Sequence, residues 1–134
     1  VYDRPNDHLL GGIIMVIKKE AQRIQVRDNI RGGPGRLENR HILEKEQMFG
    51  AATLLTEFYF DPGDGIGPHV HQDDPELYYI LEGELTLCED GKETVLTPGD
   101  ASYAYGGVSH SIQNRSDRPA RMLALILEPK KEEK

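Results

Sequence analysis

The stretch GDGIGPHVHQDDPELYYILEG, residues 63–83, places two histidines and a glutamate close together among turn-forming and apolar residues. His69 and His71 are two residues apart, so on a β-strand both imidazoles point to the same face. Glu76 follows the bend-prone segment QDDP, and from the start of a next strand its carboxylate can turn toward the same point. Imidazole nitrogens and carboxylate oxygens bind first-row divalent metal ions at about 2 Å. The stretch therefore predicts part of a metal site on two neighbouring strands.

A fourth ligand has to come from another part of the chain, and His110 is the candidate. His8 and His41 are expected on the surface or in packing contacts rather than at the site. Three imidazoles and one carboxylate suit Mn, Fe, Co, Ni or Zn, and the sequence does not choose among them. One carboxylate beside one divalent ion leaves net positive charge, which favours an anionic ligand.

Short apolar runs separated by turn signals surround this stretch. Turns are predicted at residues 61–67, 90–91 and 97–100, and residues 44–50 have at most one helical turn. Residues 29–38 hold three glycines and a proline and are expected to be irregular. Within them, RGGPGR (31–36) could cradle an anion, but it lacks the Gly-Lys-Ser/Thr ending of a phosphate-binding loop, so a mobile loop over the mouth of the fold is expected. Many short, evenly spaced strands predict an all-β sandwich or barrel. The predicted strands are residues 13–17, 51–60, 76–81, 84–89, 92–96, 101–105, 110–113 and 120–127.

The stretch resembles the first motif of the cupin superfamily: Gly, five residues, His-x-His, four residues, Glu, six residues, Gly. It matches at every fixed position. The second motif is Gly, five residues, Pro-x-Gly, two residues, His, three residues, Asn, and here Tyr105 replaces the proline. The matching positions are Gly63, His69, His71, Glu76 and Gly83 in the first motif, and Gly99, Gly107, His110 and Asn114 in the second.

The resemblance implies a small single-domain metal-binding cupin. Its fold would be a double-stranded β-helix, or jelly-roll barrel, with little helix, and His69, His71, Glu76 and His110 would hold one divalent metal ion. The expected boundaries are an N-terminal extension over residues 1–12, one cupin domain over 13–128 and a charged tail over 129–134, with Met15 an alternative start. Small cupins commonly pair through a terminal strand, so a homodimer that exchanges residues 13–17 is expected.

Three functions stay open, because one fold hosts many reactions. The first is an enzyme that oxidises, decarboxylates or cleaves a small carboxylate or enol, as the resemblance to oxalate decarboxylases and dioxygenases implies. Against a strict oxalate decarboxylase, this chain has a single cupin domain, Ile66 where those enzymes carry arginine, and no clear glutamate on a lid. The second is a sugar isomerase or epimerase, and the third is a non-catalytic module that binds a small molecule.

Tyr103 and Tyr105 share one face of a predicted strand ahead of His110. Either hydroxyl is a candidate to donate a proton to a bound ligand, so both are candidate catalytic residues. The alternative is that they pack in the barrel with hydrogen-bonded hydroxyls, which is expected for at least one of them. Tyr78 and Tyr79 follow Glu76 on alternating faces, so one of them is expected to point inward.

The whole chain limits its partners. Its 134 residues fit one domain, and its net charge of −7 argues against nucleic acid and against anionic membrane surfaces. No apolar run is long enough to span a bilayer, and the polar start does not resemble a secretory signal. The single cysteine, Cys88, excludes an intrachain disulfide and fits a small apolar role on a strand. A cytoplasmic protein with a small-molecule ligand is therefore expected.

Overall fold

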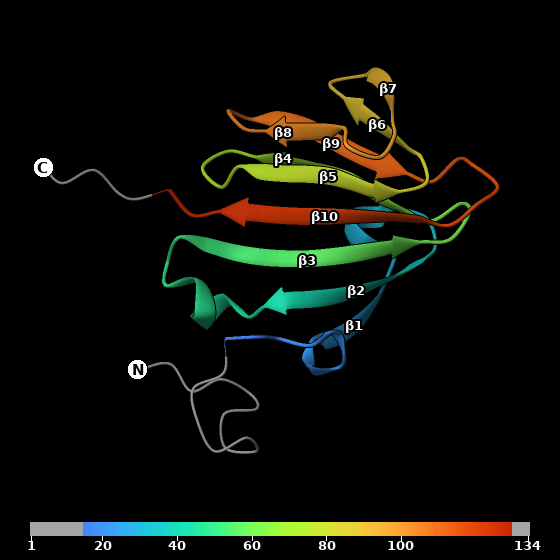
Figure 1. Cartoon of the computed structure of the whole chain (residues 1–134). Helices are drawn as coiled ribbons and strands as arrows, with labels where there is room; N and C mark the ends of the chain where they lie inside the picture. The colour runs from blue at the N-terminus through green and yellow to red at the C-terminus, as the bar shows by residue number, and fades with distance from the viewer. Residues whose placement is uncertain (1–14, 130–134) are drawn as a thin grey trace, which may run out of the picture.

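The structure is a computed structural model that describes residues 15–129 as two antiparallel β-sheets (Figure 1). One sheet has six strands in the order β1-β2-β3-β10-β5-β8, and the other has four in the order β4-β9-β6-β7. The strands are β1 (Arg23–Asp28), β2 (Arg36–Leu43), β3 (Ala52–Phe60), β4 (Gly65–His71), β5 (Glu76–Glu82), β6 (Leu85–Glu89), β7 (Lys92–Leu96), β8 (Ala101–Ala104), β9 (Val108–Gln113) and β10 (Ala120–Leu127). The only helices among the described residues are short 3₁₀ helices, η1 (Lys19–Ala21), η2 (Ile30–Gly32) and η3 (Lys45–Met48).

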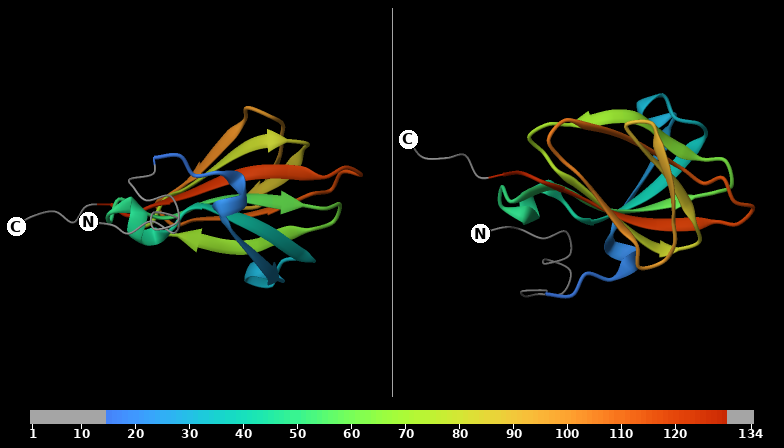
Figure 2. Two further views of the ribbon diagram at one scale, coloured as in Figure 1. Left: turned by 60° about the horizontal axis from the view of Figure 1, so that its bottom comes forward. Right: turned by 90° about the horizontal axis from the view of Figure 1, so that it is seen from above.

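The strands curve around one interior, which the view from above makes plain (Figure 2). Side chains alternate between this interior and the solvent: on β3, Thr56, Phe58 and Phe60 are buried, whereas the residues between them are half-buried. The predicted all-β barrel with little helix is confirmed. The buried apolar side chains include Phe58, Phe60, Tyr78, Ile80, Leu85, Leu87, Ile112 and Met122.

Strands β1 and β2 are absent from the sequence-based prediction, which was wrong there. The inner face of β2 carries Asn39 and His41, and the facing position on β1 is Gln25, so polar residues interrupt the expected apolar alternation. These side chains contact one another: Asn39 Nδ2 donates to Thr56 Oγ1 at 3.0 Å, and His41 Nε2 lies 2.9 Å from Gln25 Oε1. A hydrogen-bonded row thus takes the place of apolar packing at this edge.

Other predictions have mixed outcomes. Of the predicted strand over residues 13–17, the structure describes 15–17, which form no strand. The predicted irregular segment 29–38 is shorter, because β2 begins at Arg36. The helical turn within residues 44–50 is confirmed as η3. The predicted extension over residues 1–12 and nearly all of the tail over 129–134 lie outside the described residues, as does His8.

Asn114, the last motif position, has a structural role. Its side chain is fully buried, and its Nδ2 donates to the carbonyls of Phe60 at 3.2 Å and Arg118 at 2.7 Å. Its Oδ1 accepts from the backbone N–H of Ser116 at 3.0 Å. One amide therefore ties the β9–β10 turn to the end of β3, far along the barrel from Glu76.

No helix in the described part of the chain is long and apolar enough to cross a membrane. The cytoplasmic location stays a prediction.

Candidate metal centre

A β-bulge in β4 turns two residues, Ile66 and His69, toward the interior. Ile66 pairs with Ile112 and His69 pairs with His110, so three steps along β4 match two along β9. In a regular strand, residues three apart point to opposite faces, and the extra residue at the bulge brings Ile66 and His69 to the same face. The bulge contains Gly67 and Pro68, and proline is tolerated there because it has no N–H to pair.

Four side chains from three strands converge at this point. His69 and His71 come from β4, Glu76 from the start of β5 and His110 from β9. The Nε2 atoms of His69, His71 and His110 lie 3.3, 2.9 and 3.1 Å from one oxygen, Glu76 Oε1. The four ligand atoms lie within 4.8 Å of one another. The structure therefore brings together the four residues that the sequence predicted.

Hydrogen bonds fix which nitrogen of two rings faces the cluster. His69 Nδ1 donates to the Gly67 carbonyl at 2.8 Å, and His71 Nδ1 donates to the Asp74 carbonyl at 2.9 Å. Because a carbonyl only accepts, the proton of each neutral ring is on Nδ1 and the Nε2 lone pair faces inward. His71 Nε2 is buried without a hydrogen bond despite its short distance from Glu76, and the Nε2 atoms of His69 and His110 are 3.0 Å apart. The inward lone pairs of His69 and His71 and the Glu76 carboxylate repel one another, and a shared cation satisfies them, so the residues fit a metal ion.

The electrostatics of the cluster favour a charged carboxylate. Burial alone would raise the pKa of Glu76, but the surrounding imidazoles of His110, His69 and His71 together hold it well below its usual value. The nearby Glu76 carboxylate raises the pKa of His71. Burial of the His71 ring lowers the same pKa, but the effect of Glu76 is larger. Burial raises the pKa of the Tyr78 hydroxyl well above its usual value, and the Glu76 charge raises it further. Tyr78 thus stays protonated beside an anionic ligand.

A small cavity of about 90 Å³ opens next to the cluster. It holds about three water-sized groups, because a water occupies ~30 Å³ in the liquid. Tyr78 and two arginines, Arg27 and Arg31, add the remaining polar groups. The apolar wall is formed by Ile30, Leu54, Phe58, Ile66 and Ile126.

Comparison with known proteins agrees with this architecture. The family model described as "Cupin domain" matches residues 56–126, which include all four clustered residues. The chain is a cupin. It is 35% identical to the "Oxalate-binding protein" of Thermotoga maritima over 116 residues, which cover 87% of this chain and 96% of that protein.

Solved structures give the same fold. The crystal structure of a predicted oxalate decarboxylase from Thermotoga maritima superposes with a TM-score of 0.81 at 35% identity, over 86% of this chain and 100% of that one. The polyketide cyclase RemF from Streptomyces resistomycificus superposes with a TM-score of 0.68 at 21% identity, over 87% and 81% of the two chains. The second likeness concerns the fold alone. Proteins named as binding proteins and as enzymes therefore share this cupin architecture.

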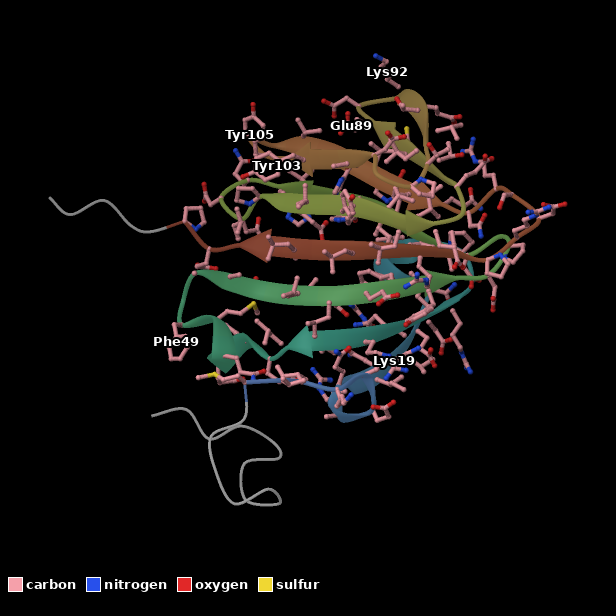
Figure 3. The ribbon with its side chains drawn as sticks, viewed as in Figure 1. Lys19, Phe49, Glu89, Lys92, Tyr103 and Tyr105 are labelled. Atoms are coloured by element: carbon pink, nitrogen blue, oxygen red, sulfur yellow. The ribbon has the colours of Figure 1, made fainter. Side chains whose placement is uncertain are left out.

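The predicted catalytic tyrosines lie away from the cavity of this cupin. Tyr103, on β8, is 47% exposed and Tyr105, just after it, is 60% exposed (Figure 3). They do share a face, and their rings contact each other at 5.4 Å, but the residue between them, Ala104, is the one that points inward. Neither hydroxyl lines the cavity. A catalytic role for Tyr103 and Tyr105 stays a prediction, and their exposed positions do not favour it.

Tyr78 is the tyrosine that reaches the cavity of the cupin. It is buried, whereas Tyr79 is exposed, so the expected alternation after Glu76 is confirmed. The ring of Tyr78 stacks on His110 with centroids 4.8 Å apart and an interplanar angle of 6°. Its hydroxyl is buried and has no hydrogen-bond partner among the described residues.

Sequence reasoning set aside Arg31 as an anion-binding residue and missed Arg27 altogether. Arg27 lies on β1 and Arg31 in η2, which are 38 or more residues before His69 in the chain. No local spacing links these segments to the histidines. The one available signal was RGGPGR, expected to cover the barrel mouth; it is packed closely against β4 there. His41 is buried and contacts Gln25 and Asn39, so it is not part of the cluster.

Proposed function

We propose that this cupin binds one divalent transition-metal ion through His69, His71, Glu76 and His110 and binds a small carboxylate at that ion. The observation that carries the proposal is the convergence of three Nε2 atoms on one carboxylate oxygen, with two of the rings held in the metal-binding tautomer. An ion bound there would act as a Lewis acid and would leave positions open for a ligand. The identity to an oxalate-binding protein supports a carboxylate as that ligand.

We further propose that the protein is an enzyme acting on this carboxylate by oxidation, decarboxylation or cleavage. The apolar wall leaves a bound ligand fewer neighbouring waters on that side and so strengthens the electrostatic interactions there. The Tyr78 hydroxyl, buried and without a partner, can donate a hydrogen bond to an oxygen of the ligand. In the described part of the chain, Tyr78 is the one proton donor of the cavity besides the arginines and the metal-ligand candidates.

A second candidate is a non-catalytic carboxylate-binding protein. It is favoured by the name of the Thermotoga relative and by the lack of a carboxylic acid other than Glu76 among the described residues of the cavity. A sugar isomerase is disfavoured by size, because about 90 Å³ beside the cluster leaves little room for a sugar.

The test combines metal analysis, ligand binding and oxygen uptake. We expect about one metal ion per chain after purification without added metal, and heat on titration with oxalate. Manganese or iron together with oxygen uptake on one small carboxylate would support the enzyme. Zinc or nickel with oxalate binding and no uptake would favour a lyase or the binding protein. A chain that retains neither metal nor oxalate would overturn the proposal.

The predicted homodimer belongs to this proposal. Ile24 and Val26 are exposed on β1, an edge strand of the six-stranded sheet, and such an edge invites pairing with a second chain. Size-exclusion chromatography with light scattering should give twice the chain mass of 15.1 kDa at micromolar concentration. A chain starting at Met15 tests whether residues 13–17 are exchanged, because it should then shift toward monomer. A monomeric full-length chain would contradict the prediction.

A further inference from the structure

Arg27 and Arg31 are the only arginine or lysine side chains among the described residues of the metal cavity. Neither makes an ion pair with a carboxylate within residues 15–129. Most other arginines are occupied: Arg23, Arg36, Arg115 and Arg121 are each paired with a glutamate or aspartate. Guanidinium groups keep their charge at all physiological pH values. Both residues are exposed, so they add two permanent positive charges at the open side of the cavity, with no ion-pair partner among the described residues.

The backbone at Arg31 is held in an unusual conformation. Its φ of 55° and ψ of 31° lie in the left-handed region, which costs a non-glycine residue energy. The turn around it is closed by Asn29, whose N–H donates to the Gly35 carbonyl at 2.9 Å and whose Nδ2 donates to the Gly33 carbonyl at 3.0 Å. Strained residues that persist in a tightly determined setting occur often at functional sites.

Close packing fixes this turn against the strand that carries two histidines of the cluster. A Cβ atom on Gly67 would lie 2.2 Å from the Arg31 carbonyl oxygen, and one on Gly33 would lie 2.6 Å from the backbone of Gly65. Gly67 also accepts the hydrogen bond from His69 Nδ1. The position of Arg31 is thus set relative to the metal cluster by direct backbone contact.

Charge balance indicates what these arginines bind. A divalent ion with Glu76 as the one anionic ligand leaves one net positive charge, and a single carboxylate neutralises it. A second carboxylate on the same ligand would then face Arg31 and Arg27 across the small cavity. Arginine binds a carboxylate with two parallel hydrogen bonds, which adds orientation to attraction.

We propose that Arg31, with Arg27 beside it, recognises the second carboxylate of a short dicarboxylate whose first carboxylate is bound at the metal. Arg31 is then the residue that makes the site prefer dianions to monocarboxylates. Position 66 supplies no such charge, because Ile66 is an apolar residue on the cavity wall. This inference rests on the proposed metal and carboxylate site.

The test compares oxalate with acetate on metal-loaded protein by calorimetry. Arg31→Gln should weaken oxalate binding by about tenfold to a hundredfold, because a charge-assisted hydrogen-bonded pair is lost. Acetate affinity and metal content should stay unchanged. Arg31→Lys should recover part of the oxalate affinity, since it restores the charge without the planar fork. The matched control is Arg118→Gln, an exposed arginine in the β9–β10 turn, which should change neither affinity.

Three results would overturn the inference. Unchanged oxalate affinity in Arg31→Gln would exclude a role for Arg31, and an equal loss of oxalate and acetate would show a general effect on the site rather than recognition of a second carboxylate. Both leave the proposed function standing, because the parent still binds metal and carboxylate. A parent that binds neither compound would remove the proposed function and this inference together.

Discussion

Replacing Glu76 with glutamine is expected to lower the bound metal from about one ion per chain to less than about a tenth. Glu76 is the one carboxylate of the cluster, and its Oε1 lies within 3.3 Å of all three facing Nε2 atoms. Glutamine keeps the shape but removes the negative charge, and the loss of a ligand charge costs more than the loss of an outer hydrogen bond, which typically costs 10–100-fold in affinity. His71→Ala should have the same effect. Metal content is measured by elemental analysis after dialysis.

The barrel should still form in both variants. The buried side chains that hold the two sheets together, such as Ile80, Ile112 and Met122, are separate from the ligands. The far-ultraviolet circular dichroism spectrum should therefore stay that of the parent. Added metal should raise the melting temperature of the parent and not of the variants, because only a folded chain that binds the ion gains stability from it.

Glu82→Gln is the matched control. It makes the same substitution on the same strand, β5, but its side chain is exposed at the opposite end. It should retain metal and the melting response of the parent. If Glu76→Gln bound metal as tightly as Glu82→Gln, the cluster would be wrongly assigned.

The metal cluster was predictable because its parts are close in sequence or fall at fixed motif spacings. His69 and His71 are two apart on one strand, and Glu76 begins the strand that follows. The bulge could not be derived from spacing alone, since it depends on how β4 pairs with β9. Without it, Ile66 and His69 would point to opposite faces. The spacing thus identified the ligands, whereas the pairing of β4 with β9 sets the direction in which the side chains of β4 point.

The missed features share a different cause. The inner faces of β1 and β2 carry Gln25, Asn39 and His41, whose hydrogen-bond partners are on other strands and are not visible in a local pattern. Tyr103 and Tyr105 were correctly placed on one face, but the choice between inside and outside depends on Ala104, which packs inward. Alternation along a strand does not tell which of its two faces is buried. In each case, long-range packing decides between the two faces.

Gly67→Ala is expected to lower the free energy of unfolding by about 4 kcal/mol, because the added methyl group overlaps backbone atoms that cannot rotate away. The new Cβ would lie 2.2 Å from the Arg31 carbonyl oxygen and 2.8 Å from the Gly33 nitrogen. Relief requires that the turn carrying Arg31 move off β4, so oxalate affinity should fall as well. Urea unfolding at an unchanged slope measures the stability, and calorimetry measures the affinity.

Gly50→Ala separates this clash from the ordinary cost of losing a glycine. Gly50 has a φ of +77°, and a Cβ there would meet no atom within 4 Å, so alanine should cost only the left-handed backbone, about 1–2 kcal/mol. Its oxalate affinity should equal that of the parent. If the two substitutions lowered the free energy of unfolding equally, the turn that carries Arg31 would move away from the new methyl group at no energetic cost. If Gly67→Ala also kept the parent's oxalate affinity, contact with Gly67 would not be what positions Arg31 beside the metal cluster.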